Sequence, residues 1–221
     1  KIACDLVGEC IEKYPEAVGF ELGGSYAKGT WVPEKPVDNV DIDIFVKFNK
    51  KTSEKDFRNI GTKIGFESLK KYRPYTRHAE HPFVEAIIDG TRVNVVPCYD
   101  VNKGEWKSAT DRSIYHTKFM LQKLSNSMKG DVRILKKFLQ HIEVYGAEIA
   151  KEGFSGYVTE ALIFYFGSFE KTIKRISELK KGQVIGKSTK KFDSFVVIID
   201  PIDNNRNLGT AISIDNLGKF V

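Results

Sequence analysis

Two aspartates with one residue between them, inside an apolar run, constrain the fold of this chain most strongly. The segment Val40–Phe48 is rich in β-branched and aromatic residues, which is typical of a β-strand. Because strand side chains alternate between faces, Asp41 and Asp43 then project from one side and Ile42 from the other. The strand must therefore have one apolar face against a core and one face that carries two neighbouring negative charges.

These two like charges repel each other, so something cationic must offset the repulsion. Divalent cations that prefer oxygen ligands meet this need, and Mg²⁺ is the usual choice beside phosphates. We therefore interpret Asp41 and Asp43 as the platform for a metal ion.

A glycine pair, Gly23-Gly24, stands before Ser25 at the end of an earlier apolar segment. Glycines let the backbone approach a ligand closely, and Lys28 and Thr30 follow within what we expect to be the same loop. By itself this motif is more often an ordinary tight turn than a triphosphate cradle. Followed by two aspartates on the next strand, it is typical of nucleotidyl transfer.

The first half of the chain predicts an α+β fold. Asp89-Gly90 is a strong hairpin signal, so the strands on either side of it should be antiparallel neighbours. Ser53 can cap a helix, with Asp56 at the capping-box distance. We expect residues 1–110 to form one domain, a mixed, mainly antiparallel sheet with flanking helices, whose strands are Val18–Leu22, Val40–Phe48, Phe83–Ile88 and Arg92–Pro97.

From Asp111 onward the pattern becomes helical, and we expect residues 111–221 to form a second, mostly helical domain and the start of a further segment. One helix places Lys136 away from its apolar stripe, and another helical run extends from Tyr157 to about Lys180. Phe195–Ile199 is typical of a buried strand. The apolar stripe consists of Val132, Leu135, Leu139 and Ile142.

Composition indicates which class of partner the protein binds and in which cellular compartment it works. A chain of 221 residues with 41% hydrophobic content can bury a real core. Its formal net charge of +6 favours a polyanionic partner such as nucleic acid. Cys4, Cys10 and Cys98 form neither a disulfide framework nor a zinc pattern, which favours a reduced, cytoplasmic protein. No apolar run approaches the roughly 20 residues needed to cross a bilayer, so we expect no membrane role.

Both ends of the sequence fall inside helical patterns, and the first residue is Lys1. We therefore expect this chain to be a fragment of a longer protein.

Several separated segments, in the same order along the chain, resemble the archaeal (class I) CCA-adding enzymes. These belong to the nucleotidyltransferase superfamily that also includes DNA polymerase beta and the poly(A) polymerases. The resemblance implies a catalytic head followed by a helical neck, and template-independent addition of C, C and A to the 3′ end of the tRNA acceptor stem from CTP and ATP with Mg²⁺. It leaves open whether the protein forms a homodimer. The segments are Gly24-Ser25 with Lys28 and Thr30-Trp31, then Asp41 to Phe45, Ala79 to Pro82, Val95 to Tyr99, Val144 to Glu148, Gly153 to Tyr157, and Asp200-Pro201 with Arg206-Asn207.

The resemblance also implies roles for single residues. Arg206 would read the base, because a guanidinium presents a rigid fork of donors, and Ser113 would lie near the sugar. The residues that would touch the triphosphate are Gly24, Ser25, Lys28, His81, Lys136 and Tyr145.

At one position the sequence departs from the family pattern. The family's third carboxylate comes from a later strand, and here Asn94 stands where it is expected, facing away from Val93 and Val95. An amide oxygen can contact a cation, but it carries no charge and accepts no proton as a general base. We therefore expect Asp41, Asp43 and Asn94 to be the catalytic and metal-binding set, with impaired turnover. Asp89 and Asp100 are poor substitutes, since one belongs to the turn and the other follows Pro97.

Other interpretations stay open at this point. The chain can be a non-catalytic RNA- or nucleotide-binding module that kept the fold, or a relative of oligoadenylate or poly(A) synthetases. Taken singly, the residues assigned to nucleotide binding also have ordinary roles. These roles are a polar loop residue for His81, a solvated charge for Lys136, packing for Tyr145 and a surface ion pair for Arg206.

Overall fold

The structure, a computed structural model, describes residues 1–33, 40–77, 82–146, 148 and 150–221. The chain divides into two compact units, residues 1–118 and residues 119–221. The domain boundary that we expect at residues 110 and 111 stays a prediction. Among the described residues, no helix has both the length and the apolar character that crossing a bilayer requires.

The first unit is built on a five-stranded sheet with the order β1-β2-β5-β4-β3. The central pair, β2 and β5, is parallel, whereas the pairs β1–β2, β4–β5 and β3–β4 are antiparallel. The sheet is therefore mixed and mainly antiparallel, and the predicted α+β class is confirmed. The strands are β1 (Ala17–Gly23), β2 (Asp41–Asn49), β3 (Tyr75–Arg77), β4 (Phe83–Ile88) and β5 (Thr91–Asp100).

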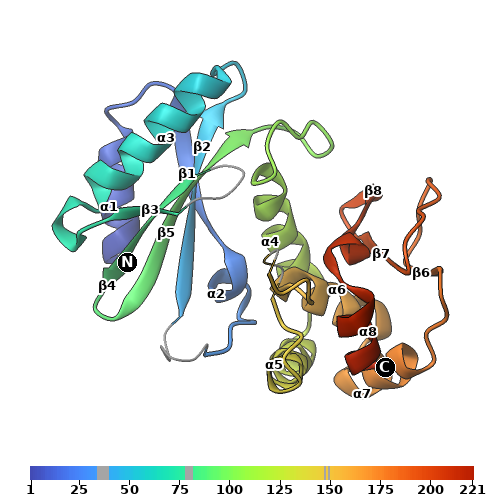
Figure 1. The fold of residues 1–221 in the computed structure, drawn as a ribbon. Coiled ribbons are helices and arrows are strands. Elements are labelled where there is room, and N and C mark those ends of the chain that lie inside the picture. The colour runs from blue at the N-terminus through green and yellow to red at the C-terminus, as the bar shows by residue number, and fades with distance from the viewer. Residues whose placement is uncertain (34–39, 78–81, 147, 149) are drawn as a thin grey trace. The chain divides into compact units, whose positions relative to one another are not determined.

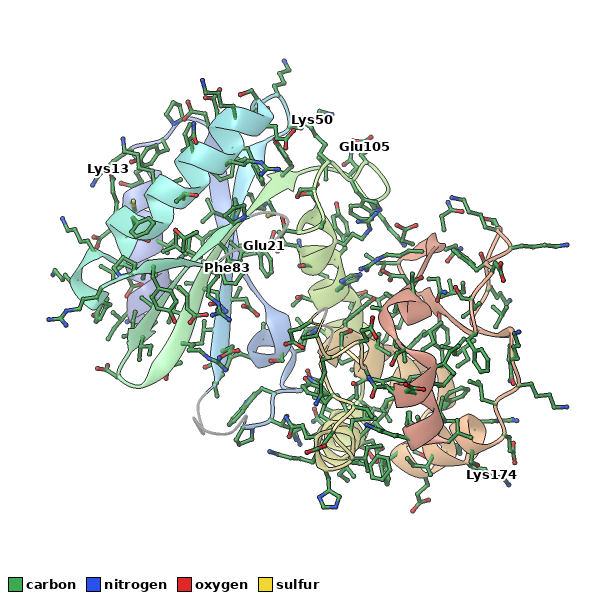
Figure 2. The ribbon with its side chains drawn as sticks, in the orientation of Figure 1. Lys13, Glu21, Lys50, Phe83, Glu105 and Lys174 are labelled. Atoms are coloured by element: carbon green, nitrogen blue, oxygen red, sulfur yellow. The ribbon has the colours of Figure 1, made fainter. Side chains whose placement is uncertain are left out.

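Two helices, α1 (Ile2–Ile11) and α3 (Glu54–Ser68), cover one face of this sheet (Figure 1). Ile44 of β2 and Val93 and Val95 of β5 pack beneath them and are almost completely buried. The alternate residues of the same strands belong to the other face, together with Glu21 and Phe83, which Figure 2 labels. Alternation thus separates an apolar, helix-covered face from a face that carries polar side chains.

The hairpin turn and the helix cap form as the sequence predicts. Asp89 and Gly90 both have positive φ, of 48° and 78°, and close a two-residue hairpin between β4 and β5. The Ser53 hydroxyl accepts a hydrogen bond from the Asp56 backbone N–H, so Ser53 caps α3 as expected. The turn fixes the pairing of Ile88 with Thr91, and this in turn sets the register of the whole hairpin.

The second unit packs helices around a core with a small three-stranded sheet, β6-β7-β8. The predicted helical run from Tyr157 to Lys180 is two helices, because Gly167 adopts φ 90° and ends the first of them. The predicted strand near Phe195–Ile199 is β7, while β6 and β8 have no strong apolar pattern and were not predicted. The elements are α5 (Asn126–His141), α6 (Gly156–Phe166), α7 (Phe169–Ser177), β6 (Gln183–Ile185), β7 (Val196–Asp200), β8 (Asp203–Asn207) and α8 (Ile214–Phe220), and they follow α4 (Asp111–Lys123), in which the two units divide.

Candidate active site

The polar face of the first unit's sheet brings the two aspartates together with their neighbours on β1 and β5. Asp43 is paired in register with Gly23 on one side and with Asn94 on the other. Asp41 is paired with Arg92, two residues earlier on β5. The prediction that the two acids share one face is confirmed, because Ile42 and Ile44 belong to the helix-covered core.

Asp41 has a cationic partner inside the protein. The Arg92 Nε–H donates to Asp41 Oδ1 at 2.6 Å, and both side chains are partly exposed. Burial nevertheless raises the pKa of Asp41, although the Arg92 charge and hydrogen bond act in the opposite direction. One arginine therefore offsets only part of the penalty of placing a carboxylate here.

Asp43 is more deeply placed and has a neutral partner. The Asn94 amide Nδ2 donates to Asp43 Oδ1 at 2.9 Å. Burial raises the pKa of Asp43, and the charge of Asp41 adds to this, while the Asn94 hydrogen bond and the Lys28 charge lower it. The charged form of Asp43 is thus disfavoured in the protein alone, and a bound cation would favour it.

The Gly-Ser segment lies directly against Asp43. Gly24 has φ 69°, and a Cβ atom at this position would lie 1.8 Å from Asp43 Oδ2, so only glycine fits. The segment is a short helix, α2 (Gly24–Lys28), and not the loop that we expected, since Gly29 with φ 71° ends it after little more than one turn. Ser25 is half-buried and Lys28 is buried with its charge acting on Asp43. The predicted meeting of the acids with the segment around Ser25 is therefore observed.

The donor set fits an oxygen-preferring cation. Asn94 is only 8% exposed, and its Oδ1 atom is buried without a hydrogen-bond partner. Burying an acceptor without a partner costs free energy unless a ligand binds to that oxygen. With the carboxylates of Asp41 and Asp43, it offers three oxygen donors of the kind that Mg²⁺ takes. Within the described part of the chain, no group of three or more His, Cys, Asp or Glu residues is arranged to hold a metal, and the Asn94 amide oxygen is a candidate third ligand beside the two carboxylates.

One acid beside this site was missed in the sequence analysis. Glu85 on β4 is paired in register with Asn94, is 6% exposed, and therefore lies on the same face as Asp43. The Tyr75 hydroxyl donates to Glu85 Oε1, and Arg77 Nε lies 3.8 Å from Oε2. The Asp89-Gly90 turn was the signal that could have found it, because a two-residue loop places residue 85 opposite residue 94.

Neither Asp89 nor Asp100 is placed to replace the third carboxylate of the family. Asp89 is exposed in the hairpin turn. Asp100 is at the far end of β5, where its carboxylate lies 3.3 Å from Lys47 Nζ. Both are therefore poor candidates for the third carboxylate, as the sequence predicts.

Ser113 is half-buried on α4, the helix that follows the sheet. One turn later, the Thr117 hydroxyl lies 3.3 Å from the Cβ position of Gly23, so this part of α4 runs beside the Gly-Ser segment. Asp111 anchors the start of α4, since its carboxylate accepts hydrogen bonds from the backbone N–H groups of Tyr99, Lys107 and Ser108. His81, which the resemblance assigns to the triphosphate, lies outside the described residues.

Lys136 and Tyr145 come together in the second unit. The Tyr145 hydroxyl and Lys136 Nζ lie 3.0 and 3.5 Å from the Cβ position of Gly156, at the start of α6. Lys136 is only 2% exposed and its Nζ lies 3.8 Å from the fully buried Glu160 carboxylate. The expectation that Lys136 lies away from the buried face of its helix is therefore wrong. A lysine pays the large penalty of such burial only beside a carboxylate or another strong partner.

Arg206 is held by an acid that sequence reasoning did not single out as its partner. Asp200 is fully buried, and it accepts hydrogen bonds from Arg206 Nη1 at 3.1 Å and from the Tyr157 hydroxyl at 3.0 Å. Burial and the Asp200 charge raise the pKa of Tyr157, so its hydroxyl stays protonated and donating. The Arg206 side chain remains 43% exposed, which leaves part of its guanidinium accessible.

Comparison with known proteins gives two matching family models. Residues 3–116 match the model described as nucleotidyltransferase domain, and residues 130–221 match the one described as tRNA nucleotidyltransferase, second domain. The CCA-adding enzyme of Picrophilus torridus is 38% identical over 199 residues, which are 89% of this chain and 45% of that protein. The CCA-adding enzyme of Pyrobaculum islandicum is 38% identical over 226 residues, covering 98% and 51%. The chain thus spans about half the length of these relatives.

Solved structures are similar in fold at low sequence identity. A crystal structure of the Cid1 poly(U) polymerase has a TM-score of 0.70 and 11% identity, covering 98% of this chain and 82% of that one. The structure of E. coli MS115-1 CdnC with ATP has a TM-score of 0.67 and 16% identity, covering 99% and 78%. At these identities, the likeness concerns the fold alone.

Proposed function

Because this chain belongs to the nucleotidyltransferase domain family, we propose that it forms part of a template-independent tRNA nucleotidyltransferase that adds C, C and A to the tRNA 3′ end from CTP and ATP. The relatives named CCA-adding enzyme and the match to a tRNA nucleotidyltransferase second domain support the substrate class. The observation that carries the proposal is the contact of Gly24 with the Asp43 carboxylate, which places a glycine backbone beside two acids.

In this reaction, the terminal ribose 3′ hydroxyl attacks the α-phosphorus in line, and pyrophosphate leaves. Asp41, Asp43 and the Asn94 amide oxygen would hold Mg²⁺. When bound, the ion would supply positive charge to the triphosphate and the attacking oxygen. Gly24 lets the backbone lie directly against the Asp43 carboxylate, and Ser25 and Lys28, which follow it on α2, would position the triphosphate oxygens. Most of the rate then comes from positioning and electrostatic stabilisation.

Asn94 limits this chemistry. Its Nδ2 is already committed to Asp43, and its Oδ1 carries no charge and takes no proton from the attacking hydroxyl. We infer weak CCA addition by this chain, with nucleotide binding largely kept, because Asn94 leaves unchanged Ser25 and Lys28 on α2, to which we assign contacts with the triphosphate.

The second unit would supply nucleotide recognition. The Lys136 ammonium and the Tyr145 hydroxyl lie together beside the start of α6, a pair of donors of the kind that suits phosphate oxygens, and Lys136 Nζ also lies beside the Glu160 carboxylate. Arg206, fixed by Asp200 and partly exposed, would read the base edge. The partner that these groups serve is CTP or ATP, with the tRNA acceptor stem as the primer.

A labelled-nucleotide assay tests the proposal. The purified protein is incubated with Mg²⁺, a tRNA that lacks its terminal CCA, and labelled CTP or ATP, while filter binding measures its affinity for the same tRNA. We expect Asn94→Asp to raise CTP incorporation by about 100-fold or more, as adding a catalytic acid or base typically does. Asn102→Asp makes the same charge change at an exposed loop position and should leave incorporation unchanged.

A second candidate function, a non-catalytic RNA- or nucleotide-binding module, is favoured by Asn94 and by the net charge of +6. Tight tRNA binding with no transfer in the Asn94→Asp protein would support it and overturn the first proposal. Incorporation of long A tracts without any use of CTP would instead identify a poly(A)-type activity.

A further inference from the structure

We propose that Glu85 supplies the negative charge that Asn94 lacks, and that it strengthens cation binding by Asp41 and Asp43 without being a direct ligand. The inference rests on the proposed function only in taking these two aspartates as a cation site. It assigns Glu85 as a positioning residue for the cation.

The register of the sheet carries this inference. Asp43, Asn94 and Glu85 occupy equivalent positions on three adjacent strands, β2, β5 and β4. Residues paired in this way project from the same face, so Glu85 lies immediately beyond the amide that contacts Asp43. Moving an acid from residue 94 to residue 85 keeps it in the same row and displaces its charge by one strand.

The surroundings of Glu85 hold its carboxylate in one place. Its side chain is 6% exposed, and a carboxylate is rarely buried so deeply without partners. Tyr75, its register partner on β3, and Arg77 contact the two carboxylate oxygens from the side away from Asn94. They fix the carboxylate beside the row.

The indirect role follows from what the face does not contain. Among the described residues, Asp41, Asp43 and Glu85 do not form a group able to hold a metal directly. The unpartnered Oδ1 of Asn94, buried between the strands of Asp43 and Glu85, is the atom that would face the cation. Glu85 would then act through its charge across that amide, as outer carboxylates do around metal sites.

A purely structural role makes a different prediction. If Glu85 only anchors the edge strand β3, losing its hydrogen bond from Tyr75 should matter as much as losing its charge. Tyr75→Phe removes the hydroxyl and keeps the carboxylate, whereas Glu85→Gln keeps the shape and removes the charge.

The test measures Mn²⁺ binding to the purified protein without nucleotide, by electron paramagnetic resonance of free Mn²⁺, with circular dichroism to check the fold. We expect Glu85→Gln to weaken Mn²⁺ binding about tenfold, in the range found for outer carboxylates. Tyr75→Phe should change the affinity less than about twofold. Asn94→Asp should tighten binding about tenfold, and in that background Glu85→Gln should cost less than about threefold, because neighbouring charges are not additive.

Three results would overturn the inference. The first is unchanged Mn²⁺ affinity in a folded Glu85→Gln protein, and the second is an equal loss on Glu85→Gln in the parent and in the Asn94→Asp background. The third is Mn²⁺ binding that is unchanged by Asp43→Asn. That result would also show that the two aspartates are not the cation site. Absence of CCA addition by the Asn94→Asp protein, together with the expected Mn²⁺ pattern, would overturn the proposed function and leave the role of Glu85 standing.

Discussion

Asp43 in the first unit and the buried acids of the second unit have opposite kinds of partner. In the second unit, Glu160 faces Lys136 and Asp200 faces Arg206, so each buried acid has a cation from the protein itself. In the first unit, Asp43 has an amide as its direct partner, and burial raises its pKa. An acid matched within the protein is part of its framework, whereas an incompletely matched acid beside a glycine backbone is a place where a cation from solution gains binding energy.

The first prediction tests the matched pair and has the largest expected effect. Lys136→Met leaves the Glu160 carboxylate buried beside a methyl group, so the free energy of unfolding should fall by about 3–5 kcal/mol. The double change Lys136→Met with Glu160→Leu removes both charges and should recover most of that loss. Urea unfolding of the three proteins measures this, and a double variant as unstable as the single one would show that the two residues are not a matched pair.

The second prediction tests the close approach on the unmatched side. Gly24→Ala would place a methyl group against Asp43 Oδ2 in a backbone with φ 69°, so it should lower the free energy of unfolding by about 2 kcal/mol or more and abolish Mn²⁺ binding. Gly182→Ala provides the control, since Gly182 has φ 74° with nothing within 4 Å. A loss no greater than that of the control would mean that strain alone, and not the contact with the acid, keeps glycine at position 24.

The third prediction follows from the raised pKa of Asp43. Below the ordinary pKa of aspartate, this group is protonated in both the folded and unfolded states and contributes nothing to stability. As the pH rises to the raised pKa of the folded state, the unfolded state releases its proton more readily, so metal-free stability falls. Asp43→Asn should therefore raise the free energy of unfolding at pH 7 by about 1–2 kcal/mol, a typical gain when a functional charge is removed.

Thermal unfolding across pH 4–8, with and without Mn²⁺, measures this effect. Mn²⁺ should stabilise the parent increasingly as the pH rises and should leave the Asp43→Asn protein unaffected. Stability that instead rises with pH in the metal-free parent relative to the variant would reverse the assigned sign.

The fourth prediction is the smallest and concerns the support of Arg206. Tyr157→Phe removes one hydrogen bond to Asp200 and should lower the free energy of unfolding by about 1 kcal/mol. Because Arg206 keeps its own bond to Asp200, we expect the affinity for CTP to fall only slightly, by about two- to threefold, as measured by equilibrium dialysis. Loss of CTP binding as complete as in Arg206→Ala would show that Tyr157 does more than support the arginine.

The sequence predicted the sheet well where one local rule decides the outcome. Alternation placed Asp41 and Asp43 together, and the Asp89-Gly90 turn paired β4 with β5. The parallel pairing of β2 with β5 was not predicted, because it joins segments about 50 residues apart and has no local signal. That pairing is what brings Asn94 to Asp43.

Charge partners were the harder part of the site to predict. In the sequence, polar residues flank Lys136 on its helix. Its burial beside Glu160 depends on the packing of α5 against α6, which no local pattern indicates. The sequence predicts a loop where α2 forms, because glycines stand at its start and it is too short to show a helical apolar period. The Lys136 error arises from a tertiary contact that overrides a local pattern, whereas the α2 error arises from a helix too short to produce such a pattern.

One row of register partners crosses all five strands of the first unit's sheet and limits how related sequences can differ in length. Its members are Gly23, Asp43, Asn94, Glu85 and Tyr75. Inserting or deleting one residue in β2 ahead of Asp43, or in β5 ahead of Asn94, would turn every later side chain of that strand to the opposite face. Asp43 or Asn94 would then point into the apolar core under α1 and α3. We expect aligned homologues to be free of gaps in both strands, with length variation confined to the connections between them.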